Sequence, residues 1–260
     1  MNKNLDWRLG CQTYTFRHFT LFEAIEKNAA LGLKCIEAYP GQMLSPELST
    51  TAFNHLLPQE QLDALKAKLE SAGVALVNYG VVAMPDEEER QRVFDFAKKM
   101  GIETVVCEPP LDSLDRVEEH CERYGINVAI HNHPAPSIYW NPDTVLEACK
   151  GRSSYIGSCA DTGHWVRSGV NPLEAMQKLE GRIISLHIKD VDRQAPDAQD
   201  VPWGTGVGDV EALLEEVRQQ NLTPVFSIEY EAADEEDPSP EVAKCVEFYS
   251  DVCRRLAGQS

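Results

Sequence analysis

Short apolar runs rich in valine and isoleucine alternate along the whole chain with amphipathic segments of helical periodicity. The expected strands are, in order, 9–13, 34–38, 74–79, 103–108, 126–131, 155–160, 183–187 and 224–229. The expected helices follow at 21–31, 59–71, 86–100, 111–124, 143–150, 172–179, 210–220 and 240–256. Glycines such as Gly73, Gly101 and Gly125 end several of these helices, and Pro172 opens one, as is usual at helix boundaries.

The regular alternation predicts the fold class. A strand followed by a helix, repeated eight times in 260 residues, predicts a parallel sheet that closes into a (β/α)8 barrel. We expect residues 1–260 to form one α/β domain, because no linker or low-complexity stretch divides them. The alternative is an open, doubly wound sheet. Against it, neither a GxGxxG motif nor a phosphate-binding loop follows any expected strand.

Ionisable residues gather where the expected strands end. In such a barrel the C-terminal ends of the strands converge on one axis, and active sites lie there. The last four strands end at His131, Asp161, His187 and Glu229. Two imidazoles and two carboxylates predict a divalent metal site, with manganese, zinc, cobalt, iron and magnesium as candidates. His164 follows Asp161 by three residues in an expected turn, so it is a further ligand or a group that supports one.

Several motifs carry a family resemblance. The segments HNHP at 131–134, DTGHW at 161–165, LHIKD at 186–190, GTGVGDV at 204–210 and IEYE at 228–231 resemble the sugar phosphate isomerase/epimerase group of xylose isomerase-like TIM barrels. The resemblance implies a metal held by Glu, Asp, His and Glu on the last four strands. Asp161, His187 and Glu229 match three of these ligands, whereas His131 stands where the group carries glutamate.

The resemblance implies a metal-dependent isomerase or epimerase that acts on a sugar, sugar phosphate or sugar acid through an enediolate. Glu229 is the expected base, and His164, Glu108 or Lys189 the expected acid. A metal-bound imidazole is a poor base, so His131 disfavours epimerisation by two symmetric glutamates. It thereby favours the alternative, a lyase or dehydratase of a keto-sugar, keto-glycoside or keto-inositol, which needs a base on one side only.

Six residues are expected to bind the carbohydrate substrate: Tyr14, Glu37, His133, Trp165, Arg193 and Trp203. Arg193 lies where the resemblance implies a substrate-binding arginine. A solvated loop arginine, a structural ion pair for Glu37 and plain packing for the tryptophans are equally open interpretations.

Composition limits the partners. With 24 basic and 42 acidic residues, the net charge of -18 excludes nucleic acid and anionic membranes as expected partners. The charge also disfavours a DNA-repair endonuclease. The resemblance implies extra histidines on the early strands of such an enzyme, whereas this chain carries Asn78, Tyr79 and Cys107 there. Eight cysteines without a CxxC pair, and no apolar leader or membrane span, predict buried reduced thiols and a cytoplasmic location. By analogy with such barrels, a homodimer is an open expectation. A barrel that binds carbohydrate without turnover is a further alternative for the function.

Overall fold

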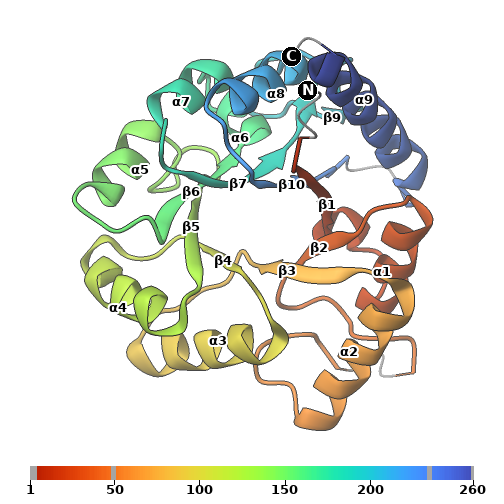
Figure 1. Cartoon of the computed structure of the whole chain (residues 1–260), viewed down its shortest axis with the longest axis vertical. Helices are drawn as coiled ribbons and strands as arrows, with labels where there is room; N and C mark the ends of the chain where they lie inside the picture. Colours follow the sequence, from red (N-terminus) through yellow and green to blue (C-terminus); the bar gives the residue numbers. More distant parts are fainter. Residues whose placement is uncertain (1–4, 48–50, 233–235, 259–260) are drawn as a thin grey trace.

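A closed parallel barrel forms the centre of the computed structural model, which describes residues 5–47, 51–232 and 236–258. The strands pair in the order β1-β10-β7-β6-β5-β4-β3-β2, and the helices surround them (Figure 1). The barrel strands are β1 Arg8–Gln12, β2 Cys35–Ala38, β3 Ala75–Tyr79, β4 Thr104–Cys107, β5 Asn127–His131, β6 Ile156–Asp161, β7 Ile183–Ile188 and β10 Val225–Ile228. The predicted (β/α)8 fold class is confirmed, and the open-sheet alternative is wrong.

The expected helices are also confirmed, with small shifts at their ends. They are α1 Leu21–Ala30, α2 Gln59–Ala72, α3 Glu87–Met100, α4 Leu114–Tyr124, α5 Pro142–Cys149, α7 Pro172–Lys178, α8 Val210–Gln219 and α9 Ser239–Gly258. The segment expected as one helix at 111–124 is divided into a 3-10 turn, η2 Leu111–Ser113, and α4. In the described part of the chain, no helix is long and apolar enough to cross a membrane.

The helix α3 illustrates how the sequence sets a boundary and a buried face. Asp86 caps it by accepting a hydrogen bond from the Glu89 backbone N–H at 2.9 Å, and Gly101 ends it in the left-handed conformation. Between these ends, Phe96 packs on Tyr79 of β3 with ring centroids 4.9 Å apart, and Phe94 packs on His120 of α4 at 5.2 Å. Burial of each such side chain contributes roughly 1.5–3 kcal/mol to the free energy of unfolding.

Three short elements at the C-terminal ends of the strands were not expected. They are the 3-10 turn η1 Thr13–Phe16, the helix α6 Thr162–Arg167 and a two-stranded hairpin of β8 Asp190–Val191 with β9 Asp200–Val201. The predicted turn after Asp161 is a helix, so that prediction was wrong in detail. A six-residue helix is too short to show a periodic pattern in the sequence.

Asp190 organises the glycine-rich loop that follows β9. Its carboxylate accepts backbone N–H groups of Gly204 and Gly206 at 2.9 Å on Oδ2, and of Gly208 at 2.9 Å on Oδ1. A Cβ atom on Gly206 would lie 2.4 Å from Asp190 Oδ1, which explains why this motif requires glycine. Asp190 follows Lys189 directly in the chain, so its carboxylate fixes the loop after β9 beside the end of β7.

We predict that Asp190→Ala lowers the free energy of unfolding by about 3 kcal/mol, because several backbone donors would lose a charged, buried acceptor. Chemical denaturation checks this. The matched control is Asp197→Ala on the same segment, where the side chain is exposed and pairs with Arg193. The control should leave stability nearly unchanged. Equal stability of the two variants would show that the carboxylate does not hold the loop.

Candidate metal centre and substrate pocket

Four buried side chains converge at the C-terminal end of the barrel. His131 ends β5, Asp161 ends β6, His187 lies in β7, and Glu229 follows β10. One ligand atom from each lies within 4.8 Å of the others. His131 Nε2 lies 3.5 Å from Asp161 Oδ2, and His187 Nδ1 lies 3.0 Å from Glu229 Oε2. The parallel register, which pairs Asp161 with His187 across β6 and β7, produces this arrangement.

The donor set fits a metal ion. In the described part of the chain, His131 Nε2 and His187 Nδ1 are buried and make no well-aligned hydrogen bond. Buried imidazole nitrogens without a partner are costly unless something takes up their lone pairs. Two imidazole nitrogens beside two carboxylates suit a borderline divalent ion such as zinc, manganese or cobalt. The cluster could therefore bind a metal.

Glu37 fixes the orientation of His187 from inside the barrel. Glu37 Oε1 lies 2.8 Å from His187 Nε2, and the carboxylate also accepts from Gln12 Nε2 at 3.1 Å, Asn78 Nδ2 at 3.2 Å and Ser227 Oγ at 3.3 Å. A proton on Nε2 leaves the Nδ1 lone pair directed at the cluster, as is usual for metal-binding histidines. Glu37 is fully buried and does not line the pocket, so its position supports a structural role.

Lys189 supplies a second fixed element of the site. Its buried Nζ lies 2.7 Å from Asp161 Oδ2, 2.6 Å from Glu229 Oε2 and 3.4 Å from Glu231 Oε2. Burial opposes its charge, but the three carboxylates outweigh burial and raise the pKa of Lys189 well above its usual value. Two of these carboxylates, Asp161 and Glu229, also belong to the cluster, so Lys189 balances part of its negative charge. Because Lys189 holds its proton so tightly, its position does not favour the predicted role as an acid.

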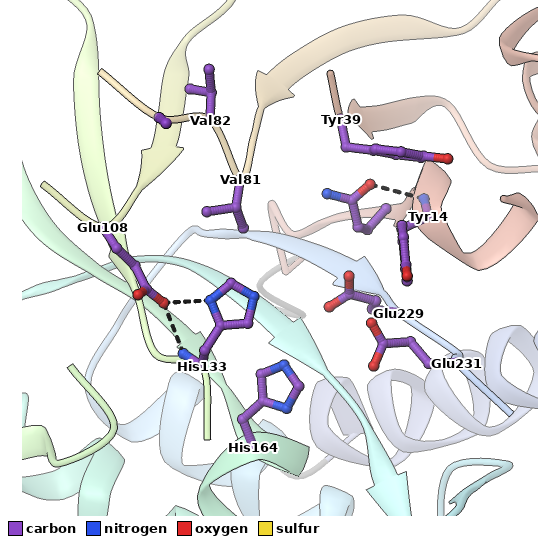
Figure 2. A pocket seen from close by; sticks show the side chains of 11 residues that line it. Tyr14, Tyr39, Val81, Val82, Glu108, His133, His164, Glu229 and Glu231 are labelled. Atoms are coloured by element: carbon purple, nitrogen blue, oxygen red, sulfur yellow. Dashed lines mark hydrogen bonds and ion pairs between the residues drawn. The ribbon is translucent and has the colours of Figure 1, made fainter. Parts of the chain in front are cut away.

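Above the cluster lies an open pocket of about 590 Å³ (Figure 2). His164, Glu229 and Glu231 line it on the side of β6 and β10, and Glu108 and His133 line it on the side of β4 and β5. The remaining lining residues come from the end of β1 and from the segments that follow β1, β2 and β3. They are Gln12, Tyr14, Tyr39, Val81, Val82 and Ala83.

Glu108 and His133 form a hydrogen-bonded pair at the pocket wall. Glu108 Oε1 accepts from the backbone N–H of His133 at 3.0 Å and from its Nδ1 at 2.5 Å, while Oε2 accepts from Ser137 Oγ at 3.1 Å. Burial opposes ionisation of Glu108, but hydrogen bonds from His131 and His133 outweigh it and lower its pKa. Glu108 orients His133 through these hydrogen bonds, and its lowered pKa does not favour the predicted role as an acid.

The other titratable groups at the site differ in charge. Burial and the nearby Lys189 lower the pKa of His164 well below its usual value, despite the opposing effect of Asp161, so this imidazole is neutral. Burial raises the pKa of Glu231, and the neighbouring Glu229 adds to the effect, although Lys189 opposes it. Burial disfavours the Glu229 carboxylate, but Lys189 and His187 outweigh it and lower its pKa.

Besides Glu37, three further residues predicted to bind substrate do not line the pocket. Trp165 is fully buried, and Trp203 is buried with its Nε1 donating to the Ile188 carbonyl at 3.2 Å. Arg193 is exposed on its loop and pairs with Asp192 and Asp197. These positions support packing for the tryptophans and a solvated surface role for Arg193, while Tyr14 and His133 do line the pocket.

Sequence analysis did not select Tyr39, Val81 or Glu231 as site residues. Glu231 follows Glu229 by two positions and therefore points to the same side, a signal that the sequence carried. Tyr39 and Val81 follow β2 and β3 directly, but such residues have no chemical signature of their own.

The sequence profile of the xylose isomerase-like TIM barrel family matches residues 25–249. The chain belongs to this family. The motif resemblance is thereby confirmed. Among solved structures, an uncharacterized protein from Parabacteroides distasonis ATCC 8503 is 37% identical to this family member, with a TM-score of 0.77 over 95% of this chain and 99% of that one.

Two further comparisons are with a named enzyme and with a metal-bound structure. The inosose dehydratase of Lacticaseibacillus casei is 26% identical over 86 residues, which cover 33% of this chain and 29% of that enzyme. The matched segments span only 27% to 31% of the length of the curated relatives. The structure of the IolI protein with a bound zinc atom shares the fold at 16% identity, with a TM-score of 0.72 over 95% of this chain and 98% of that one.

We predict that His131→Ala weakens the binding of zinc or manganese at least about 100-fold, because it removes one of four donors. Metal content after dialysis, and a titration against a competing chelator, check this. His18→Ala, which lies outside the cluster and the pocket lining, is the matched control and should bind metal like the parent protein. If the His131 variant binds metal as tightly as the parent protein, His131 is not a ligand and only the other three residues of the cluster hold the metal.

Metal affinity should also rise with pH. Burial opposes the charged form of His187, but Cys159, Glu37 and Glu229 outweigh it and raise its pKa well above its usual value in the metal-free protein. A metal can bind only after this proton leaves, so affinity should increase up to about tenfold per pH unit until the raised pKa is passed.

The stability of the metal-free fold should change with pH in the opposite direction to metal affinity. A raised pKa of His187 stabilises the fold below the unfolded-state pKa of about 6.5, and this contribution is lost as pH rises through the folded-state value. Chelator competition between pH 6.5 and 9, together with thermal unfolding of the metal-free protein, tests both signs. Metal affinity that does not change with pH would contradict the protonation of His187.

Proposed function

We propose that this protein is a divalent-metal-dependent sugar isomerase or epimerase. The observation that carries the proposal is the presence of acid–base groups on two sides of one pocket, above a metal-ligand cluster. Glu229 and Glu231 line one side, and His133, oriented by Glu108, lines the other. The barrel family, and the position of the site at the C-terminal ends of the strands, support the same conclusion.

A divalent ion held by His131, Asp161, His187 and Glu229 would act as a Lewis acid that polarises a substrate carbonyl and so acidifies the neighbouring carbon-bound proton. Glu229 is ionised, since its pKa is lowered, and is the proposed proton acceptor. Lys189 holds Glu229 in place at 2.6 Å and keeps it from rotating away. Glu231, with its raised pKa, lies beside Glu229 and is suited to proton exchange nearer neutral pH.

His133 provides the second acid–base group that the sequence alone did not suggest. Its Nδ1 proton is held by Glu108, so Nε2 is the ring nitrogen left to exchange a proton with substrate in the pocket. Proton return from this side gives the other epimer, or gives the isomer when it occurs at the adjacent carbon or oxygen. The absence of a glutamate at position 131 is therefore compatible with a reaction that uses two bases.

A lyase or dehydratase is the second candidate, and one observation favours it. The Glu108–His133 pair is equally suited to protonate a leaving hydroxyl or alkoxide. In that reaction Glu229 takes the proton beside the carbonyl, a carbon–carbon double bond forms, and the β-substituent departs with a proton from His133. Similarity to an inosose dehydratase over 86 residues supports this alternative.

Two features support zinc, manganese or cobalt over magnesium as the metal. Two imidazole donors suit borderline ions better than a hard ion that prefers oxygen. The IolI protein, which has the same fold, was solved with zinc.

Incubation of the metal-loaded protein with keto- and aldo-sugars in deuterium oxide tests the proposal. We expect a product with the formula of the substrate and one deuterium on carbon, detected by NMR and mass spectrometry. An unsaturated product with a released alcohol or water would instead establish the lyase. Sugar binding without either change would support a barrel that binds without turnover.

We predict that His133→Gln lowers kcat by about 10²- to 10⁴-fold while the protein retains its metal. Glu229→Gln should lose both activity and metal affinity, because it removes a base and a ligand. His18→Gln is the control for replacement of a histidine outside the pocket. If His133→Gln turns over like the parent protein, the base on that side must be another group.

A further inference from the structure

The pocket has two walls of different chemistry. Its acidic and histidine lining residues, Glu108, His133, His164, Glu229 and Glu231, follow strands within the arc from β10 through β7, β6 and β5 to β4 of the barrel. Figure 2 shows Tyr14, Tyr39 and Val81 across the pocket from His164, with Val82 farther from His164 than Val81 in this view. We call Tyr14, Tyr39, Val81, Val82 and Ala83 the apolar wall.

The one amide among the lining residues near this wall is already engaged. Gln12 Nε2 donates to Glu37 Oε1 at 3.1 Å and to the Gly80 carbonyl at 2.7 Å, and its Oε1 accepts from the Tyr14 backbone N–H at 3.0 Å. Gln12 therefore serves the barrel interior and the turn at Tyr14. It does not offer the ligand a free donor.

Two aromatic rings give the apolar wall a surface suited to another ring. Tyr14 and Tyr39 pack edge to face with centroids 5.1 Å apart, and the Tyr14 side chain remains 39% exposed. Arg17 lies 5.4 Å from the Tyr14 ring, which orients the ring further. An aromatic group that enters the pocket would pack against the Tyr14 ring and contact Val81 on the same wall.

The rim extends this apolar character beyond the pocket. Six large hydrophobic side chains are exposed in the described part of the chain: Tyr14, Leu56, Leu111, Ile138, Leu146 and Val207. Five of them, all except Leu146 on α5, lie on segments between a barrel strand and the next main helix. These segments surround the same end of the barrel as the pocket.

Charge argues against an anionic substrate. The described lining residues include three glutamates and contain neither lysine nor arginine. The cationic Lys189 is fully buried among carboxylates and is not part of the lining. Away from the proposed metal ion, a phosphate or carboxylate group on the substrate would therefore meet carboxylates of the same sign and no lysine or arginine of the lining.

We propose that the substrate is a neutral sugar that carries an aromatic substituent, and that the apolar wall binds this substituent while the sugar lies over the metal cluster. This inference rests on the proposed function and narrows its substrate class. A second sugar ring is a poorer fit, because two tyrosine hydroxyls are the wall's only side-chain hydrogen-bonding groups and most hydroxyls of the sugar would lie unpaired against valine, alanine and ring faces. The pocket volume of about 590 Å³ suits a ligand larger than one sugar ring.

Calorimetric titration of the metal-loaded full chain tests the inference. The probes are methyl and phenyl β-glycosides of glucose, galactose, mannose and xylose, with cellobiose and glucose 6-phosphate as comparisons. We expect at least one phenyl glycoside to bind about tenfold more tightly than its methyl partner, and more tightly than cellobiose or the phosphate. The inference is overturned if no phenyl glycoside binds, if each pair binds equally, or if cellobiose or the phosphate binds more tightly.

Variants of the wall residues test which side chains cause the preference for phenyl glycosides. Tyr14→Ala should remove about tenfold of the phenyl glycoside's affinity and leave that of the methyl glycoside unchanged, whereas Tyr14→Phe should retain the preference. Val81→Thr, which keeps the shape and adds a hydroxyl, should reduce the preference several-fold. Leu146→Ala, an exposed hydrophobic residue outside the pocket, should change neither affinity. A phenyl preference that survives Tyr14→Ala and Val81→Thr would place aromatic binding elsewhere and overturn the assignment.

The same preparations separate this inference from the proposed function. Metal content and deuterium uptake report on the catalytic cluster, and the phenyl-to-methyl affinity ratio reports on the apolar wall. A preference for phenyl glycosides without metal or deuterium uptake would refute the proposed function alone. Deuterium uptake from free sugars without any phenyl preference would refute the apolar wall alone.

Discussion

The hydrogen bond between Glu37 and His187, 2.8 Å long and buried inside the barrel, is the interaction on which the site depends. The Glu37 carboxylate also accepts hydrogen bonds from side chains of β1, β3 and β10. One buried charge therefore connects strands that are far apart in the sequence. A buried carboxylate is tolerated only when its acceptors are satisfied, and this requirement selects the polar residues that fill the upper barrel. The same bond leaves Nδ1 of His187 directed toward the group of side chains that could hold a metal.

Charge balance links this interior to the pocket. Asp161, Glu229 and Glu231 surround the ammonium group of Lys189, and the remaining negative charge is available to a divalent ion. Asp161 also caps α6 through Oδ1, which accepts from the His164 backbone N–H at 2.8 Å. One carboxylate thus fixes the helix that carries His164 and contributes to the cluster, so the geometry of the site is built into the secondary structure.

The histidine at position 131, where the resemblance implies a glutamate, is understood from its contacts with neighbouring residues. His131 contributes an imidazole to the cluster, and its other ring nitrogen lies 3.4 Å from Glu108. Glu108 in turn orients His133 two residues later, at the edge of the pocket. The base that a glutamate on β5 would supply is replaced, in our proposal, by a carboxylate–imidazole pair that β4 and β5 provide together.

The sequence by itself determined the barrel and the four residues of the cluster. Apolar periodicity and helix boundaries are local properties, and the C-terminal ends of parallel strands must converge once the sheet closes. Tertiary structure alone decided which polar residues face the pocket: it placed Glu37 beneath His187, kept Trp165, Trp203 and Arg193 out of the lining, and assigned Glu108 to His133. It also gathered Tyr14, Tyr39 and Val81 into one wall. Side-chain direction and long-range hydrogen bonds depend on contacts between distant strands, which no local pattern encodes.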